Sequence, residues 1–115
     1  GRVFEGTMEQ MWSSLLKLRS LPDNTDVYCG HEYTSSNAKF VNHIDPNNQL
    51  LKEAIIEIKN KRDRGLPTVP FELGKEKTIN PFLRVDDHNF TSSIGFKTSN
   101  PKEIFSAIRL QKDTF

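Results

Sequence analysis

Apolar residues recur at helical spacing in four segments of an otherwise polar chain. The first segment follows Thr7 and Gln10, a pair with the spacing of a capping box at a helix start. We therefore expect a helix from about Met8 to about Leu18. Its apolar side holds Trp12 and two methionines, which we assign to the core, because such a stripe is more often core than cofactor site.

A short strand is predicted after this helix. Turn-forming residues at 21–24 end the helix, and the sequence Asp26–Gly30 then has the composition of a strand. His31 follows directly, so it is expected at the carboxyl end of that strand. From the residues alone it is a candidate metal ligand, catalytic base or ordinary turn residue. Its neighbour Glu32 is assigned a structural role, because adjacent side chains point apart.

Two helices are expected next. The first covers about residues 38–44 and takes its cap from one of residues 34–36. The second is predicted to use Asp45 as its cap and Pro46 as its first residue, and to end before Gly65. Four cations lie near the end of this helix. Compensation of the helix macrodipole explains them without an anion site.

The rest of the chain is predicted to hold one long connection and one helix. Residues 66–80 contain two prolines and few helical signals, which favours an extended connection. Residues 86–88, Asp-Asp-His, superficially suggest a metal cluster but are better explained as a polar loop. The last helix is expected to start with Asn100 as its cap and Pro101 as its first residue.

Composition narrows the class of protein. The chain has 115 residues, and 16 Lys+Arg against 15 Asp+Glu give a net charge of +1. Its apolar runs are far shorter than the ~20 residues of a membrane span. We therefore expect no nucleic-acid partner and no membrane partner. The single cysteine, Cys29, cannot form an internal disulfide and gives no CxxC metal pattern.

Five short motifs occur in the order found in one enzyme family. They are Gly1-Arg2-Val3-Phe4-Glu5-Gly6-Thr7, Val27-Tyr28-Cys29-Gly30-His31-Glu32-Tyr33-Thr34, Pro67-Thr68-Val69-Pro70, Asn80-Pro81-Phe82-Leu83-Arg84 and Arg109-x-x-Lys112-Asp113-x-Phe115. Each is weak alone, but together, in register, they are specific. On these motifs the chain closely resembles the C-terminal portion of the glyoxalase II family, within the metallo-β-lactamase superfamily.

The resemblance implies a fold class and an activity. Members of the family have an αββα metallo-β-lactamase sandwich followed by a helical domain, so an α/β and then α-helical chain is expected. Residues 1–33 would be the C-terminal end of the sandwich, and residues 34–115 the helical glutathione-pocket domain. The implied activity is hydrolysis of S-D-lactoylglutathione, a glutathione thioester, to glutathione and D-lactate through a hydroxide bound to two metal ions.

The resemblance also implies a metal site to which this sequence contributes little. His31 matches a metal-binding histidine of the family, whose cofactor is a binuclear zinc site or a zinc and iron mixture. A catalytic zinc site generally needs three or more protein ligands. The family's other ligands lie upstream of the position that matches Gly1. We therefore expect the chain to be a truncated piece, inactive alone, in which a lone His31 does not hold metal.

The substrate-binding positions are better represented. By resemblance, Arg2, Tyr33, Arg109 and Lys112 match positions that contact glutathione, the last two at its glycine carboxylate. Cations at i and i+3 of a helix can converge on one carboxylate. Macrodipole compensation at a helix end is an equally good explanation for these two cations from the residues alone. Phe4 departs from the tyrosine that many members have.

Two alternatives to the enzyme remain open at this stage. In the first, the chain is a noncatalytic module that binds glutathione or another small anion. In the second, it is a structural or interaction fragment. If it is a truncated piece, unpaired sheet edges predict self-association. A cytoplasmic or a mitochondrial location is equally compatible with the sequence.

Overall fold

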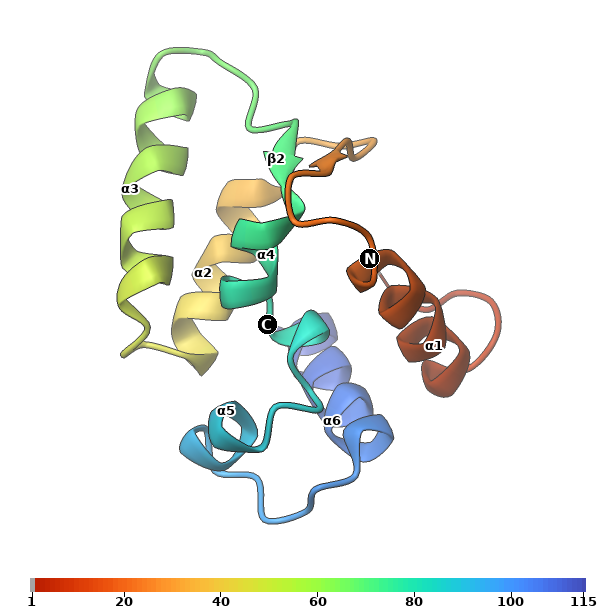
Figure 1. Cartoon of the computed structure of the whole chain (residues 1–115). Helices are drawn as coiled ribbons and strands as arrows, with labels where there is room; N and C mark the ends of the chain where they lie inside the picture. The colour runs from red at the N-terminus through yellow and green to blue at the C-terminus, as the bar shows by residue number, and fades with distance from the viewer. Residues whose placement is uncertain (1) are drawn as a thin grey trace. The chain divides into compact units, whose positions relative to one another are not determined.

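The computed structural model describes residues 2–115, which form two compact units (Figure 1). The terminal unit combines residues 2–21 with Asn80–Phe115, and the central unit spans Pro22–Ile79. Most of the described residues are helical, which confirms the helical part of the expected fold. The predicted domain boundary between residues 33 and 34 differs from these divisions and stays a prediction about the longer family architecture. Gly1 lies outside the described residues.

Two α-helices and a 3₁₀ turn build the core of the terminal unit. They are α1 (Met8–Arg19), α6 (Pro101–Thr114) and η1 (Pro81–Leu83), with a short helix α5 (His88–Ser93) between η1 and α6. Trp12 of α1 and Phe105 of α6 have ring centroids 6.1 Å apart, and Phe82 of η1 meets Phe105 edge-on at 5.4 Å. Trp12 is buried, as predicted for the apolar stripe.

Side-chain caps begin both long helices of the terminal unit where the sequence predicts them. Thr7 and Gln10 form a complete capping box, in which the Gln10 amide N–H donates to Thr7 Oγ1 at 3.1 Å. Asn100 accepts a hydrogen bond from the Lys102 amide at 3.1 Å, and Pro101 is the first helical residue. Each cap satisfies an amide that has no partner within the helix, so both boundaries could be predicted.

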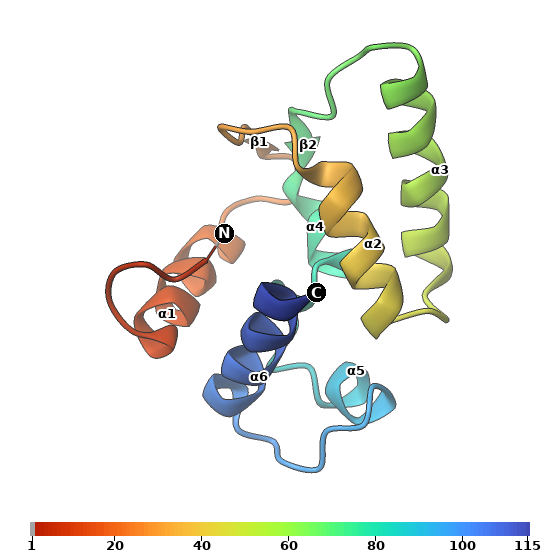
Figure 2. The ribbon, with the colours of Figure 1, turned by 180° about the vertical axis from the view of Figure 1, so that it is seen from behind.

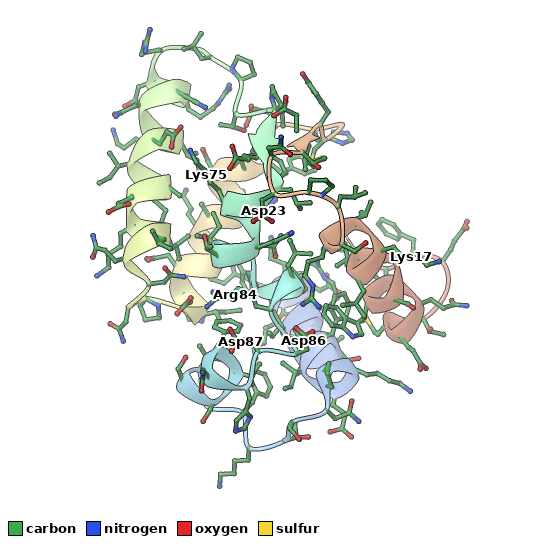
Figure 3. All side chains as sticks on the ribbon, in the orientation of Figure 1. Lys17, Asp23, Lys75, Arg84, Asp86 and Asp87 are labelled. Atoms are coloured by element: carbon green, nitrogen blue, oxygen red, sulfur yellow. The ribbon has the colours of Figure 1, made fainter. Side chains whose placement is uncertain are left out.

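The predicted polar loop at residues 86–88 is only partly correct, because His88 begins α5 and both aspartates have specific partners. Arg19 donates to both oxygens of Asp86, at 2.6 Å and 2.8 Å, and also to the Leu83 carbonyl at 3.0 Å. Asp87 caps α5 by accepting from the Phe90 amide. Figure 3 labels the two aspartates between η1 and α5. The two aspartates together fix the segment that joins η1 to α5.

The central unit contains a minimal sheet and three helices. Strands β1 (Asp26–Val27) and β2 (Phe71–Glu72) pair antiparallel. Helices α2 (Thr34–Ile44) and α3 (Gln49–Asp63) pack side by side, and α4 (Leu73–Ile79) follows β2 (Figure 2).

The predicted strand at 26–30 is too long. In the antiparallel register Asp26 faces Glu72 and Val27 faces Phe71, so Tyr28 would face Pro70, which has no amide N–H to donate to the ladder. His31 consequently lies in a loop rather than at a strand end.

Residues 66–80 are only partly the extended connection that the sequence predicts, because they also contain β2 and α4. Gly74, a poor helix former, is needed here for close packing. A Cβ at this position would lie 2.9 Å from the Asp23 Cβ, and the Gly74 amide donates to the Asp23 carbonyl at 2.8 Å. Lys77 of α4 pairs with the Asp23 carboxylate at 2.6 Å. Tertiary contacts thus override the weak helical propensity of this segment.

The predicted starts of α2 and α3 are also wrong. The residue preceding α2 is Tyr33, which makes no side-chain capping bond. Helix α3 is capped by Asn48, not by Asp45, which instead follows the end of α2. The Asn48 side chain accepts from the Leu51 amide at 3.2 Å and donates to the Asp45 carboxylate at 2.9 Å and the Thr78 carbonyl at 3.1 Å. Asn48 thus connects the end of α2 and the start of α3 to α4.

Helices among residues 2–115 are all too short or too polar to cross a membrane.

We predict that Asp86→Asn lowers the free energy of unfolding of the terminal unit by about 1 kcal/mol at neutral pH, since a paired, partly exposed carboxylate contributes at this scale. The hydrogen bonds from Arg19 lower the pKa of Asp86. The folded-state pKa is therefore below the unfolded one. The stabilisation is present above the unfolded-state pKa and is lost as pH falls through the folded-state pKa.

Denaturant unfolding followed by Trp12 fluorescence at neutral and acidic pH measures this effect, because Trp12 is the chain's one tryptophan. Asp63→Asn is the matched control, as Asp63 pairs with Lys59 on the exposed face of α3 in the other unit. An equal loss in both variants, or a loss that persists in acid, contradicts the assignment.

Candidate functional site

The loop between β1 and α2 presents aromatic side chains to solvent. It covers residues 28–33, in which Tyr28 and Tyr33 are 73% and 60% exposed. The His31 and Tyr33 rings stack almost parallel, with centroids 4.9 Å apart and planes 10° from parallel. An exposed stacked pair offers a flat surface and polar groups to a ligand, and it brings two of the residues singled out by the sequence into contact.

Glu32, between these two residues, faces a different part of the central unit. Its Oε1 accepts from the Thr68 amide at 2.7 Å, and its Oε2 accepts from the Thr68 hydroxyl at 2.7 Å. These bonds lower the pKa of Glu32, and the Arg62 guanidinium, 3.8 Å away, acts in the same direction. A carboxylate with both oxygens engaged and a lowered pKa is poorly suited to accept a substrate proton. The structural interpretation of Glu32 fits this geometry.

The metal that the resemblance implies does not fit the described residues by themselves. Across residues 2–115, no group of three or more His, Cys, Asp or Glu side chains lies close enough to hold an ion. The ring of His31 stacks on Tyr33, while His43 lies in α2 of the same unit and His88 begins α5 in the terminal unit. One imidazole falls short of the three or more ligands a zinc site needs.

A cationic cluster lies at the C-terminal end of α6 in the terminal unit. Arg109 donates from Nε and Nη2 to the same oxygen of Asp113, at 3.2 Å and 2.9 Å. The Arg2 Nε lies 3.8 Å from that oxygen. Lys112 belongs to the last turn of α6. Asp113 thus brings together two of the predicted glutathione-binding cations, and the third, Lys112, directly precedes it in the sequence.

The cations of this cluster differ in exposure. Arg109 is only 6% exposed, and its guanidinium carbon lies 5.1 Å from the Phe82 ring centroid, a cation–π arrangement. The side chain of Arg2 is 62% exposed. Arg109 is therefore held rigidly by Asp113 and the aromatic core, whereas Arg2 borders solvent. Because two guanidinium groups share one aspartate, the pair keeps a net positive charge and suits an anionic group.

The predicted site residues fall into both compact units. Arg2, Arg109 and Lys112 belong to the terminal unit, and His31 and Tyr33 to the central unit. Sequence reasoning missed two contributors. Asp113 follows Arg109 by four residues on a helix, a spacing that predicts an ion pair. Thr68 lies 36 residues from its partner Glu32, so no local pattern pointed to that contact.

Comparison with known proteins gives the class to which this chain belongs. Residues 32–115 match the family model described as "Hydroxyacylglutathione hydrolase C-terminus". The chain belongs to this family, and the match confirms the family suggested by the five motifs. The matched range includes three of the predicted site residues, Tyr33, Arg109 and Lys112, and begins directly after His31.

Individual relatives share the sequence along the whole chain. Proteins named hydroxyacylglutathione hydrolase are 50% identical in Ruegeria pomeroyi, 49% in Rhodospirillum rubrum and 46% in Maricaulis maris, each over 115 residues and 100% of this chain. The match covers 45% of each relative. The chain thus spans about half the length of the curated relatives it matches.

We predict that Asp113→Ala destabilises the terminal unit by about 2 kcal/mol. Removing one partner of a buried pair costs roughly 3–5 kcal/mol, and the partial exposure of Asp113 reduces that figure. Denaturant unfolding followed by Trp12 fluorescence measures the change. A double-mutant cycle with Arg109→Met isolates the interaction. In the Arg109→Met background, Asp113→Ala should have little further effect; full additivity would mean that the two side chains do not interact.

Proposed function

We propose that this chain is the C-terminal part of a hydroxyacylglutathione hydrolase, which cleaves S-D-lactoylglutathione to glutathione and D-lactate. The observation that carries the proposal is the identity of 46–50% with relatives of that name over the whole chain. The family match over residues 32–115 supports it independently. The compared range includes both groups of candidate site residues, those of the loop at 28–33 and those at the end of α6.

In this proposal the chain binds and orients the glutathione part of the substrate. Lys112 and Arg2 would attract the glycine carboxylate of glutathione, and Arg109 would add a fixed guanidinium held by Asp113. Charge-assisted bonds of this kind are about twice as strong as neutral ones. Tyr33 would contact the peptide with its exposed ring and hydroxyl.

The proposal includes zinc only through one residue of this chain. His31 would serve as one ligand of the family's zinc site, with the remaining ligands supplied from outside residues 2–115. Its neighbour Tyr33 would support the imidazole ring by stacking. When bound, the metal supplies an activated hydroxide and Lewis-acid polarisation of the thioester carbonyl.

A noncatalytic anion-binding module is the alternative that the cationic cluster favours. Arg2, Arg109 and Lys112 would bind glutathione or another small carboxylate without turnover. Self-association through sheet edges remains a separate prediction; within residues 2–115 the observed ladder is limited to β1 and β2. Turnover separates the enzyme from the module, and sedimentation of the chain tests association.

A hybrid enzyme tests the proposed function. This chain would replace the matching 115 residues of the Ruegeria pomeroyi relative, and hydrolysis of S-D-lactoylglutathione would be followed at the thioester absorbance with zinc present. We expect the hybrid to turn over substrate. Saturable glutathione binding by the chain, combined with an inactive but folded hybrid, would favour the anion-binding module instead.

We predict that Lys112→Met in the hybrid raises KM about tenfold with little change in kcat. A lost charge-assisted bond costs roughly 1.5 kcal/mol, and a bond present in both ground and transition states affects KM alone. Lys102→Met is the matched control, because Lys102 lies at the other end of α6 and pairs with Glu9. Equal KM values for the two variants would remove Lys112 from the binding site.

A further inference from the structure

One carboxylate, that of Glu32, connects the 28–33 loop to the segment before β2. The Thr68 amide and hydroxyl donate to its two different oxygens, both at 2.7 Å. Thr68 is 5% exposed, so the donor side of these partly buried bonds is shielded from solvent. A neutral side chain cannot accept from both donors with the strength of a carboxylate. Glu32 is therefore a specific anchor rather than a solvated surface charge.

The anchor extends to two helices of the central unit. The Thr34 and Thr68 hydroxyl oxygens lie 2.6 Å apart. A threonine hydroxyl has one proton, and Thr68 donates its proton to Glu32, so Thr34 is the donor in this second bond. Arg62 of α3 lies 3.8 Å from the carboxylate and donates to the Leu66 carbonyl at 2.9 Å. The start of α2 and the end of α3 thus meet at Glu32.

The loop has little else to fix it. Strand pairing ends at Val27, and the residue before α2, Tyr33, makes no side-chain capping bond. Both aromatic rings of the His31 and Tyr33 stack are on exposed residues. An exposed stack of two rings contributes roughly 0.5–1.5 kcal/mol, too little to hold a six-residue loop alone. The partly buried bonds of the intervening Glu32 supply the missing constraint.

We propose that Glu32 is a positioning residue, which holds His31 and Tyr33 in their stacked arrangement by accepting both donors of Thr68. Its effect on catalysis rests on the proposed function, because His31 and Tyr33 are the residues that would contact metal and substrate. Its effect on the loop is independent of that function. Glu32 itself touches neither reacting atom, since both of its oxygens are engaged with Thr68.

The first experiment measures the loop itself, in the 115-residue chain by NMR. In the wild type the centroids of the His31 and Tyr33 rings are 4.9 Å apart, so nuclear Overhauser effects between the two rings should be present. We expect Glu32→Gln and Thr68→Val to weaken these effects at least threefold, while the conservative Thr68→Ser retains them. Glu57→Gln, which removes an equivalent charge that pairs with Lys61 on α3, is the matched control.

The second experiment measures the consequence in the hybrid enzyme. We expect Thr68→Val and Glu32→Gln to lower kcat/KM at least tenfold, and Thr68→Ser to restore it to within threefold of wild type. Lost stability without altered positioning would leave kcat/KM unchanged below the melting temperature. If Glu32→Gln does not fold, Thr68→Val decides alone, because it keeps the amide bond and nearly the same volume.

The outcomes separate this proposal from the proposed function. Overhauser effects between the two rings that persist in both Thr68→Val and Glu32→Gln overturn the positioning role, whatever the hybrid does. A hybrid that is inactive even with wild-type residues overturns the proposed function and leaves the NMR result to decide the positioning role. Weakened Overhauser effects with an unchanged kcat/KM would show that the stack does not serve the reaction, and would overturn its catalytic consequence.

Discussion

The bonds from Thr68 to the Glu32 carboxylate are the interaction on which the central unit's exposed loop depends. A ladder of two residues per strand cannot hold that loop, because pairing ends at Val27. The carboxylate joins the loop to Thr68, and through Thr68 to Thr34 at the start of α2. The first turn of α2 lacks a side-chain cap of its own. This contact therefore holds the loop where the two-residue ladder cannot.

Helix boundaries could be predicted from sequence where the cap is local, and not where distant contacts choose among candidates. Thr7 and Asn100 each bond to an amide within three residues, and both helix starts were predicted correctly. Asp45 and Asn48 are both good caps by residue type. The structure uses Asn48, whose amide also donates to the Thr78 carbonyl. That carbonyl lies 30 residues away, so sequence near the helix could not distinguish the two residues.

The candidate site shows the same limit in its charges. The spacing of Arg109 and Lys112 indicated a carboxylate-binding pair, but the charges around Arg109 also include Arg2, which lies beside the same Asp113 and more than a hundred residues earlier in the chain. Burial also restricts the mobility of the Arg109 side chain. A guanidinium that packs on Phe82 and bonds to Asp113 has lost most of its freedom before any ligand arrives. Preorganisation of this kind reduces the entropy lost on binding, which composition alone does not indicate.

In the sequence His31-Glu32-Tyr33 the middle residue anchors the loop and its two neighbours are exposed. This order explains the exposure of the loop. A histidine beside a glutamate suggests a ligand and a base acting together. In this loop, however, Glu32 bonds to Thr68 while the His31 and Tyr33 rings stack on each other, so the residue that anchors the backbone separates two exposed residues. Because Glu32 bonds to buried Thr68, the rings on either side of it remain outside and meet each other. Their exposure and their stacked geometry thus follow from the same carboxylate.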